Sequence, residues 1–339
     1  MKNLLKTITM ICVFSTSFVN VFAQSPTGSK ALTNIAVLYP AKDQFRVAFE
    51  AMKSELASRY ALISINIAED QKIEEISAQC KKSNVAALVL MDSKAVAKAK
   101  ELQNSDSFFV SLPKFVLMTL SAQVETKGLV NASGIAFEVP GYTLITNFKI
   151  ISQIDFSNVL VFYRSTVSSS NIEDAKKALA KEQITLDAIC VDCEKLEKTT
   201  PEDALKAMSK AFKQKSKEGK TEVVWLISDN FLVNSSNIGE FWLGKVKAKK
   251  LPVIASIETM AKIGAAIFTA DPDYVQLGVQ SANQIMQVFE EGLTTEELGF
   301  EPTISIKSTL SSPVASELGW KLKQDKLGRV DKIIEKKDK

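Results

Sequence analysis

The chain has 339 residues, of which 46% are hydrophobic and 24% charged, and its formal net charge is +3. A chain of this length is longer than one that usually folds around a single hydrophobic core, which predicts two domains. The small net charge argues against a nucleic-acid partner, which needs a clustered basic face. The sequence has no histidine, which excludes Ser-His-Asp and Cys-His catalysis and any metal site built on histidine. We expect no cofactor and no bound metal.

The first residues follow the pattern of a secretion signal. Two lysines precede an apolar run over residues 8–21, and small residues precede a cleavage point after Ala23. The run is too short to span a membrane, and no other stretch of the sequence is long and apolar enough to do so. We therefore expect a signal peptide over residues 1–23, a flexible leader over residues 24–32, and a periplasmic protein that does not span the membrane.

Strands and helices alternate along the rest of the chain. Apolar, β-branched runs predict strands that are buried on both faces, and apolar residues at helical spacing follow most of them. A first series of strands is expected at residues 34–39, 62–67, 85–91, 108–112, 114–120 and 134–138. A second series is expected from a helix over 142–154, strands over 158–163, 184–189 and 222–228, and helices over 172–180 and 201–215. This alternation predicts an α/β protein with two doubly wound parallel-sheet lobes joined by a hinge.

Four segments have a more specific pattern. They are residues 115–130 with Gly128-Leu129-Val130, residues 158–184 with a strand and a serine-rich turn, residues 225–230 with a strand ending in Asp-Asn, and residues 251–292 with two strands and an amphipathic helix containing Tyr274, Leu277, Gly278, Gln280 and Ala282. In order and spacing they resemble the ABC-transporter substrate-binding proteins of the tryptophan/tyrosine uptake type, which have the type 1 periplasmic binding protein fold. The chain departs from that family at Ser121-Ala122, where the family often has Asp-Pro, and at residues 131–134, which replace a longer glycine-rich link.

The resemblance implies two lobes that are each made from two stretches of chain. The first lobe is expected over residues 33–138 and 265–294, the second over 141–262 and 300–320, and a charged tail over 321–339. It also implies a monomeric, non-enzymatic protein that captures a small organic ligand, such as an amino acid, and delivers it to an inner-membrane ABC permease. A periplasmic ligand sensor subunit and a scaffold without a ligand, both of the same fold, remain alternatives.

Ligands of parallel α/β sheets bind beyond the carboxyl ends of the strands, so the residues near those ends are the candidates for ligand binding. They are Tyr39, Asp92, Ser93, Thr119, Ser121, Phe137, Arg164, Ser165, Asp229, Asn230, Glu258 and Asp271. Tyr39 could stack on a ligand or cover the sheet edge. Asp92 and Ser93 could hold ligand donors or cap the next helix. Thr119 and Ser121 offer hydroxyl groups to a ligand carboxylate.

Two charged residues stand out in the second series. Arg164, followed by Ser165, could bind a ligand carboxylate through two hydrogen bonds or form a surface ion pair. Asp229, followed by Asn230, ends a buried strand and therefore needs a cationic or hydrogen-bonded partner. A ligand ammonium group or a helix N-terminus would serve.

Three further candidates lie near the expected crossovers between lobes. Phe137 could form an apolar wall of the ligand cleft. Glu258 and Asp271 could contact the ligand or act as hinge residues.

The cysteines suggest structural roles. Cys80 lies on the apolar stripe of its helix, which predicts a buried free thiol. Cys190 and Cys193 form a C-x-x-C motif for which we expect a local disulfide. A catalytic redox role would need an electropositive setting, whereas Asp192 and Glu194 make this one acidic.

Overall fold

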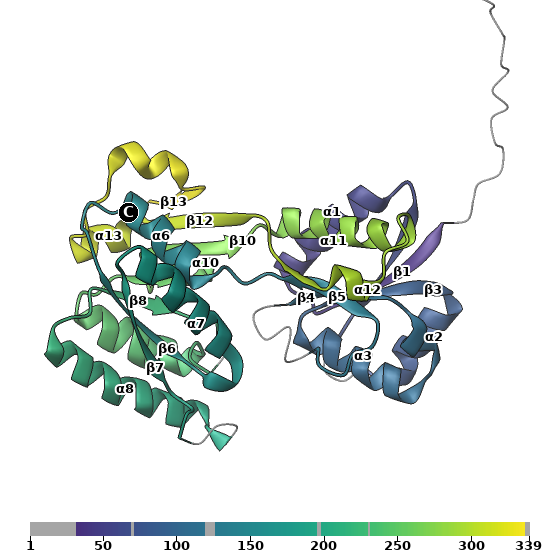
Figure 1. The fold of residues 1–339 in the computed structure, drawn as a ribbon, viewed down its shortest axis with the longest axis horizontal. Coiled ribbons are helices and arrows are strands. Elements are labelled where there is room, and N and C mark those ends of the chain that lie inside the picture. The colour runs from purple at the N-terminus through teal and green to yellow at the C-terminus, as the bar shows by residue number, and fades with distance from the viewer. Residues whose placement is uncertain (1–31, 69–70, 119–125, 195–197, 230, 336–339) are drawn as a thin grey trace, which may run out of the picture. The chain divides into compact units, whose positions relative to one another are not determined.

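The computed structural model describes residues 32–68, 71–118, 126–194, 198–229 and 231–335. The expected signal peptide and nearly all of the expected leader lie outside the described residues. The described residues form two α/β lobes, each built on its own sheet (Figure 1), which confirms the predicted fold class. No helix in these ranges is long and apolar enough to cross a membrane.

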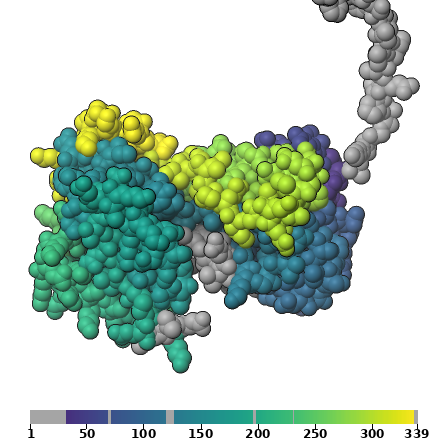
Figure 2. Space-filling view, in the orientation of Figure 1, coloured from purple at the N-terminus to yellow at the C-terminus, as the bar shows by residue number. Residues whose placement is uncertain are grey.

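The first lobe contains a sheet of six strands in the order β11-β5-β4-β3-β1-β2, all paired in parallel. Its strands are β1 Thr33–Tyr39, β2 Tyr60–Asn66, β3 Val85–Met91, β4 Lys114–Met118, β5 Ala132–Ala136 and β11 Phe300–Pro302. Its helices are α1 Asp43–Leu56, α2 Ile73–Lys82, α3 Ser93–Ser105, α4 Phe108–Ser111, α11 Tyr274–Phe289 and α12 Thr295–Leu298. In Figure 2 the yellow-green residues of α11 and α12 lie against blue and purple N-terminal elements, so two distant stretches of chain build this lobe.

Both faces of this sheet are covered, which explains its unbroken apolar strands. In β1, Ile35 and Val37 pack in one apolar cluster with α1 and α11, whereas Ala36 and Leu38 pack in another with α2 and α3. Successive side chains of a strand point to opposite faces. A sheet with helices on both sides therefore selects apolar residues at every position. Cys80 of α2 lies in the second of these clusters as a buried free thiol.

Helices α1 and α11 pack closely because α11 carries a glycine at their contact. A Cβ atom on Gly278 would lie 2.2 Å from the Ala48 carbonyl oxygen and 2.9 Å from the Ala51 Cβ atom. We expect Gly278→Ala to lower the free energy of unfolding by about 1–3 kcal/mol, because the two helix backbones must separate. Urea unfolding measures this. Gly239→Ala is the control, since a Cβ atom there meets no atom within 4 Å; equal losses in both variants would contradict the close approach.

The second lobe contains a sheet of seven strands in the order β13-β12-β10-β9-β8-β6-β7, parallel except for the antiparallel pair β10 and β12. Its strands are β6 Asn158–Tyr163, β7 Thr185–Cys190, β8 Val223–Leu226, β9 Val253–Ala255, β10 Phe268–Pro272, β12 Ile306–Ser311 and β13 Lys332–Ile334. Its helices are α6 Gly141–Ile151, α7 Ser165–Lys181, α8 Pro201–Glu218, α9 Ser235–Asn237, α10 Glu258–Lys262, α13 Ser312–Leu318, the π-helix η2 Ile238–Val246 and the 3₁₀-helix η3 Gln324–Arg329.

The observed division into lobes differs from the expected one in three places. Strand β10 pairs with β9 and β12, so it belongs to the second lobe rather than the first. Strand β11 pairs with β5 and belongs to the first lobe rather than the second. The expected charged tail supplies β13 to the second sheet, because its apolar residues Leu327 and Val330 pack on the core of that lobe. Chain order alone does not show which sheet a short strand joins.

One expected strand is a helix. Residues 108–112 were expected to be extended, but Phe108–Ser111 form α4. The Asp106 carboxylate accepts a hydrogen bond from the Phe108 N–H (3.1 Å), and the Asp106 carbonyl accepts one from the Phe109 N–H (3.1 Å). These bonds start a helical turn. A short apolar run fits a strand or a buried helix equally well by periodicity.

Candidate ligand-binding site

Five polar residues follow or end neighbouring strands of the second sheet. Arg164 follows β6, Asp192 follows β7, Asp229 and Ser256 follow β8 and β9, and Asp271 lies near the end of β10. These strands are parallel neighbours in the order β10-β9-β8-β6-β7, and adjacent strands lie about 4.8 Å apart. The five side chains, here called the strand-end group, therefore lie along one edge of the sheet, where ligands of this kind of sheet bind.

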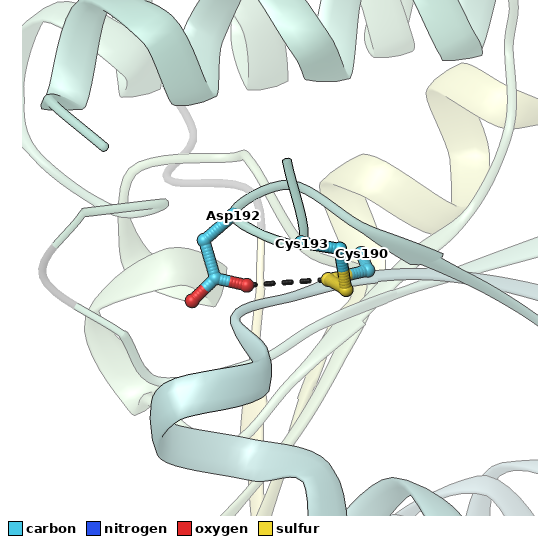
Figure 3. A group of neighbouring side chains, drawn as sticks. All are labelled: Cys190, Asp192 and Cys193. Atoms are coloured by element: carbon cyan, nitrogen blue, oxygen red, sulfur yellow. Dashed lines mark hydrogen bonds between the residues drawn. A yellow bond between two sulfur atoms is a disulfide. The ribbon is translucent and has the colours of Figure 1, made fainter. Parts of the chain in front are cut away.

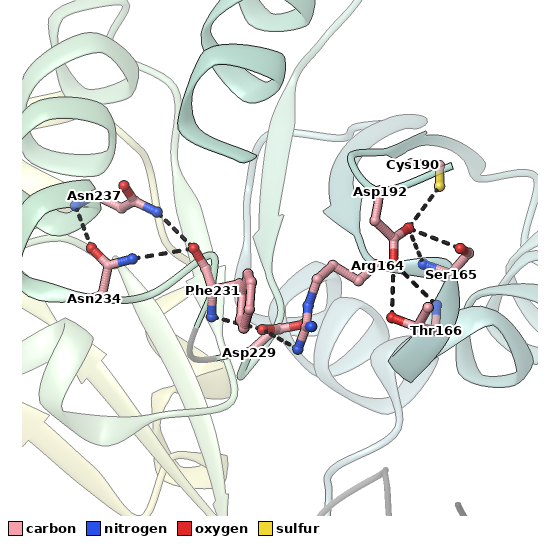
Figure 4. Close-up of polar contacts among 9 residues, drawn as sticks. All are labelled: Arg164, Ser165, Thr166, Cys190, Asp192, Asp229, Phe231, Asn234 and Asn237. Carbon is pink, nitrogen blue, oxygen red and sulfur yellow. Dashed lines mark hydrogen bonds and ion pairs between the residues drawn. The ribbon is translucent and has the colours of Figure 1, made fainter. Parts of the chain in front are cut away.

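Arg164 and Asp229 form the central ion pair of the strand-end group (Figure 4). The Arg164 Nε atom donates to Asp229 Oδ2 (2.7 Å), and Nη2 donates to Oδ1 (3.0 Å). The Phe231 N–H also donates to Oδ1 (2.8 Å), and the Phe231 ring centroid lies 4.0 Å from the guanidinium carbon. The Asp229 side chain is 1% exposed and that of Arg164 is 18% exposed.

This geometry corrects the expected role of Asp229. Its cationic partner was expected to be a ligand ammonium group or a helix N-terminus, but the partner is Arg164. The same contact overturns one of the two roles expected of Arg164, since its ion pair is largely buried rather than a surface pair. The other role, binding of a ligand carboxylate, stays a prediction. Asn230 lies outside the described residues.

Asp192 caps helix α7. Its carboxylate accepts hydrogen bonds from the backbone N–H groups of Ser165 (2.6 Å) and Thr166 (3.2 Å), and from the hydroxyl groups of both residues (2.8 Å each) (Figure 4). Burial alone would raise the pKa of Asp192, but these donors outweigh it and hold the pKa below its ordinary value. Ser165, expected to bind a ligand, thus already binds a carboxylate of the protein itself.

Cys190 and Cys193 form a disulfide on either side of Asp192, with Cα atoms 5.7 Å apart (Figure 3). The sulfur of Cys190 lies 3.2 Å from Asp192 Oδ1. The possible ligand atoms of these three residues lie within 4.8 Å of one another. They do not fit a metal ion, because metal-binding cysteine is a thiolate and both sulfurs are joined to each other.

We expect removal of this disulfide to lower the free energy of unfolding by about 2 kcal/mol, because it closes a loop of only four residues. The double variant Cys190→Ser/Cys193→Ser should show the loss in urea unfolding. Dithiothreitol should produce the same loss in the wild type and none in the variant. A wild type that is equally stable with and without reductant would contradict the prediction.

Asp271 and Ser256 are the members of the strand-end group whose side-chain oxygens lack hydrogen-bond partners within the described residues. Burial raises the pKa of Asp271 to about 6, and the neighbouring Glu258 carboxylate adds to the shift. Within the described residues, Asp271 Oδ2 and the buried Ser256 hydroxyl have no hydrogen-bond partner. Glu258, the other expected ligand contact here, instead pairs with Lys262 (2.5 Å) and Lys332 (2.6 Å).

The candidates of the first lobe also bind protein groups. The Tyr39 hydroxyl lies 2.9 Å from the Ser64 hydroxyl oxygen, and its ring stacks on Phe49 at 5.5 Å. Asp92 pairs with Lys42 (2.8 Å) and accepts a hydrogen bond from the Ser93 hydroxyl (2.7 Å). Burial would raise the pKa of Asp92, but these two donors hold it below its ordinary value.

Two expectations for the first lobe need correction. Asp92 is the residue before helix α3, yet neither it nor Ser93 caps the helix through a side-chain hydrogen bond. Phe137 is 5% exposed and packs against Phe45 and Tyr274 at centroid distances of 6.3 and 6.0 Å, so it belongs to the core of the lobe. Thr119 and Ser121 lie outside the described residues.

The sequence analysis did not identify three residues of the site, Asp192, Phe231 and Ser256. Phe231 carries no signal except its place just after Asp229. Asp192 was noted for its effect on the cysteines, while its role at α7 depends on β7 lying beside β6.

Solved structures share this fold. The chain is similar to the ABC domain from Streptococcus pneumoniae in complex with L-Trp, at 18% identity and a TM-score of 0.61. It is also similar to a conserved domain protein from Vibrio cholerae, at 18% identity and a TM-score of 0.60. A third similar structure, at 15% identity and a TM-score of 0.65, is the open, ligand-free form of a substrate binding protein with adhesive properties from Clostridium difficile. Each comparison covers 90% of this chain and 100% of the other. No curated protein matches the sequence.

A family model identifies the chain at the level of sequence. The model describes ABC transporter substrate binding proteins and matches residues 153–333, which is more than half of the chain. Proteins of this family and fold bind small ligands and are not enzymes. The chain belongs to the ABC transporter substrate binding protein family.

Proposed function

We propose that this protein is exported to the periplasm, captures a small organic ligand such as an amino acid, and delivers it to an ABC permease. The observation that carries the proposal is the strand-end group, which gathers polar side chains at the sheet edge where open α/β sheets bind ligands. The relative with bound L-Trp supports an amino acid. The ligand would be enclosed by a hinge motion of the two lobes.

One set of observations favours a second function, a scaffold that has lost its ligand. Asp229, Asp92 and Asp192 all have their charges satisfied by groups of the protein. In a site built for a ligand, some of these acids would be left for it. Asp271 and Ser256 retain unpartnered oxygens within the described residues, which supports ligand binding over the scaffold.

A thermal-shift screen separates the two functions. The mature protein, unfolded and refolded to remove any bound molecule, is tested against amino acids, simple carboxylates, purines and neutral sugars. A molecule that binds only the folded state stabilises it by about 2.7 kcal/mol at a hundredfold excess over its dissociation constant. A rise with an amino acid supports capture, and stimulation of the permease ATPase by the loaded protein would support delivery. No rise with any compound favours the scaffold.

A further inference from the structure

We propose that Arg164 binds an anionic group of the ligand, a carboxylate, and that Asp229 and Phe231 are positioning residues that hold its guanidinium. This inference rests on the proposed capture function. It assigns the charge of the ligand at this edge of the sheet and reverses the expectation that Asp229 binds an ammonium group there.

The guanidinium of Arg164 has donors left after its contacts with the protein. It carries five N–H groups, and Asp229 takes one at Nε and one at Nη2. No other hydrogen bond of this side chain is found in the described part of the chain, which leaves three N–H groups. The side chain is 18% exposed, so the protein does not cover it completely. Nη1 and Nη2 together match the two oxygens of a carboxylate.

The group is held in a fixed orientation before any ligand arrives. Asp229 accepts two hydrogen bonds from one edge of the guanidinium. The Phe231 ring covers one face, with its centroid 4.0 Å from the guanidinium carbon. Asp229 is itself fixed by the Phe231 N–H. A donor that is already ordered loses little rotamer entropy when it binds.

The neighbouring groups argue against the other ways of binding a charged ligand. Asp229 Oδ1 accepts two hydrogen bonds and Oδ2 one, and the side chain is 1% exposed, so an ammonium group has little access to it. The start of α7 would attract an anion, but the N–H groups of Ser165 and Thr166 already bind Asp192. Within the strand-end group, Arg164 is the one cationic side chain.

The first test uses paired ligands. L-tryptophan, its carboxamide and N-acetyl-L-tryptophan are titrated by calorimetry, and the same triplet is made for any other amino acid that raises the melting temperature. Loss of the carboxylate should weaken binding about 10- to 100-fold, the range for one charge-assisted pair of hydrogen bonds. Loss of the ammonium charge should cost less than loss of the carboxylate. Amide and acid of equal affinity would overturn the inference.

The second test uses variants. Arg164→Met/Asp229→Asn removes the donor without leaving a buried charge, and should weaken binding of the acid about 10- to 100-fold while the affinity for the carboxamide stays the same. Phe231→Leu, which leaves both charges in place, should reduce the ratio of acid to amide affinity, which a purely structural role would not do. Arg59→Met is the control, because the half-exposed Arg59 pairs with Glu290 of the first lobe, away from the strand-end group. An unchanged ratio in the double variant would overturn the inference.

Failure of the inference and failure of the proposed function give different results. If only neutral sugars or purines bind, the protein captures a ligand and Arg164 does not bind a carboxylate. If no compound binds, the capture function itself is wrong, and the inference falls with it.

Discussion

Arg164→Met is expected to lower the free energy of unfolding of the second lobe by about 3–5 kcal/mol. The substitution removes the cationic partner of Asp229, whose side chain is 1% exposed. The Phe231 N–H remains as a donor to that carboxylate, but a single neutral donor does not compensate a buried charge. Exposed ion pairs such as Arg46 with Asp43 contribute at most about 1 kcal/mol.

The protein provides its own probe for this measurement. All three tryptophans of the sequence, Trp225, Trp242 and Trp320, lie in the second lobe. Urea unfolding followed by tryptophan fluorescence therefore reports on the lobe that contains the ion pair. The double variant Arg164→Met/Asp229→Asn should be more stable than Arg164→Met alone, because it no longer buries an unpaired charge. A loss below about 1 kcal/mol in Arg164→Met would show that the pair behaves like a surface pair.

The fold could be predicted from the sequence because both sheets are covered on both faces. Strands such as β1, β3 and β6 are runs of buried apolar residues, and such runs are visible without knowledge of their partners. Lobe membership was less predictable. Strands β10 and β11 are short, and only their pairing with β9 and β5 shows which sheet each one joins.

The site was predictable as single residues but not as contacts. Arg164 and Asp229 could each be predicted as candidates, because each is a charged residue that follows a buried strand. Their ion pair depends on β6 and β8 being neighbours in the sheet, although the two residues are 65 positions apart in the chain. Periodicity identifies strands but does not show which strands are neighbours. The sequence therefore indicates that Asp229 needs a partner, but not that the partner is Arg164.

Asp271→Asn is expected to stabilise the folded protein at neutral pH. Burial raises the pKa of Asp271 to about 6, against an ordinary value of 3.8, so the folded state binds this proton more tightly than the unfolded chain does. Protonation therefore favours folding below pH 3.8, and this contribution is lost as the pH rises through 6. Above pH 6 this buried carboxylate is ionised in the folded protein, which lowers the free energy of unfolding by about 3 kcal/mol at most. Asparagine cannot ionise and removes that cost.

The pH dependence of this effect distinguishes it from a change in packing. At pH 7.5 the Asp271→Asn variant should be more stable than the wild type by up to about 3 kcal/mol, and the difference should shrink toward zero near pH 4. Asp43→Asn is the control, because that side chain is 96% exposed and its replacement should change the free energy of unfolding by at most about 1 kcal/mol. The carboxylate of Asp271 faces Glu258 and Lys262, so Glu258→Gln should reduce the gain by removing the nearby negative charge. A gain that is equally large at pH 4 and pH 7.5 would mean that asparagine packs better here, and that ionisation of Asp271 is not the source of the instability.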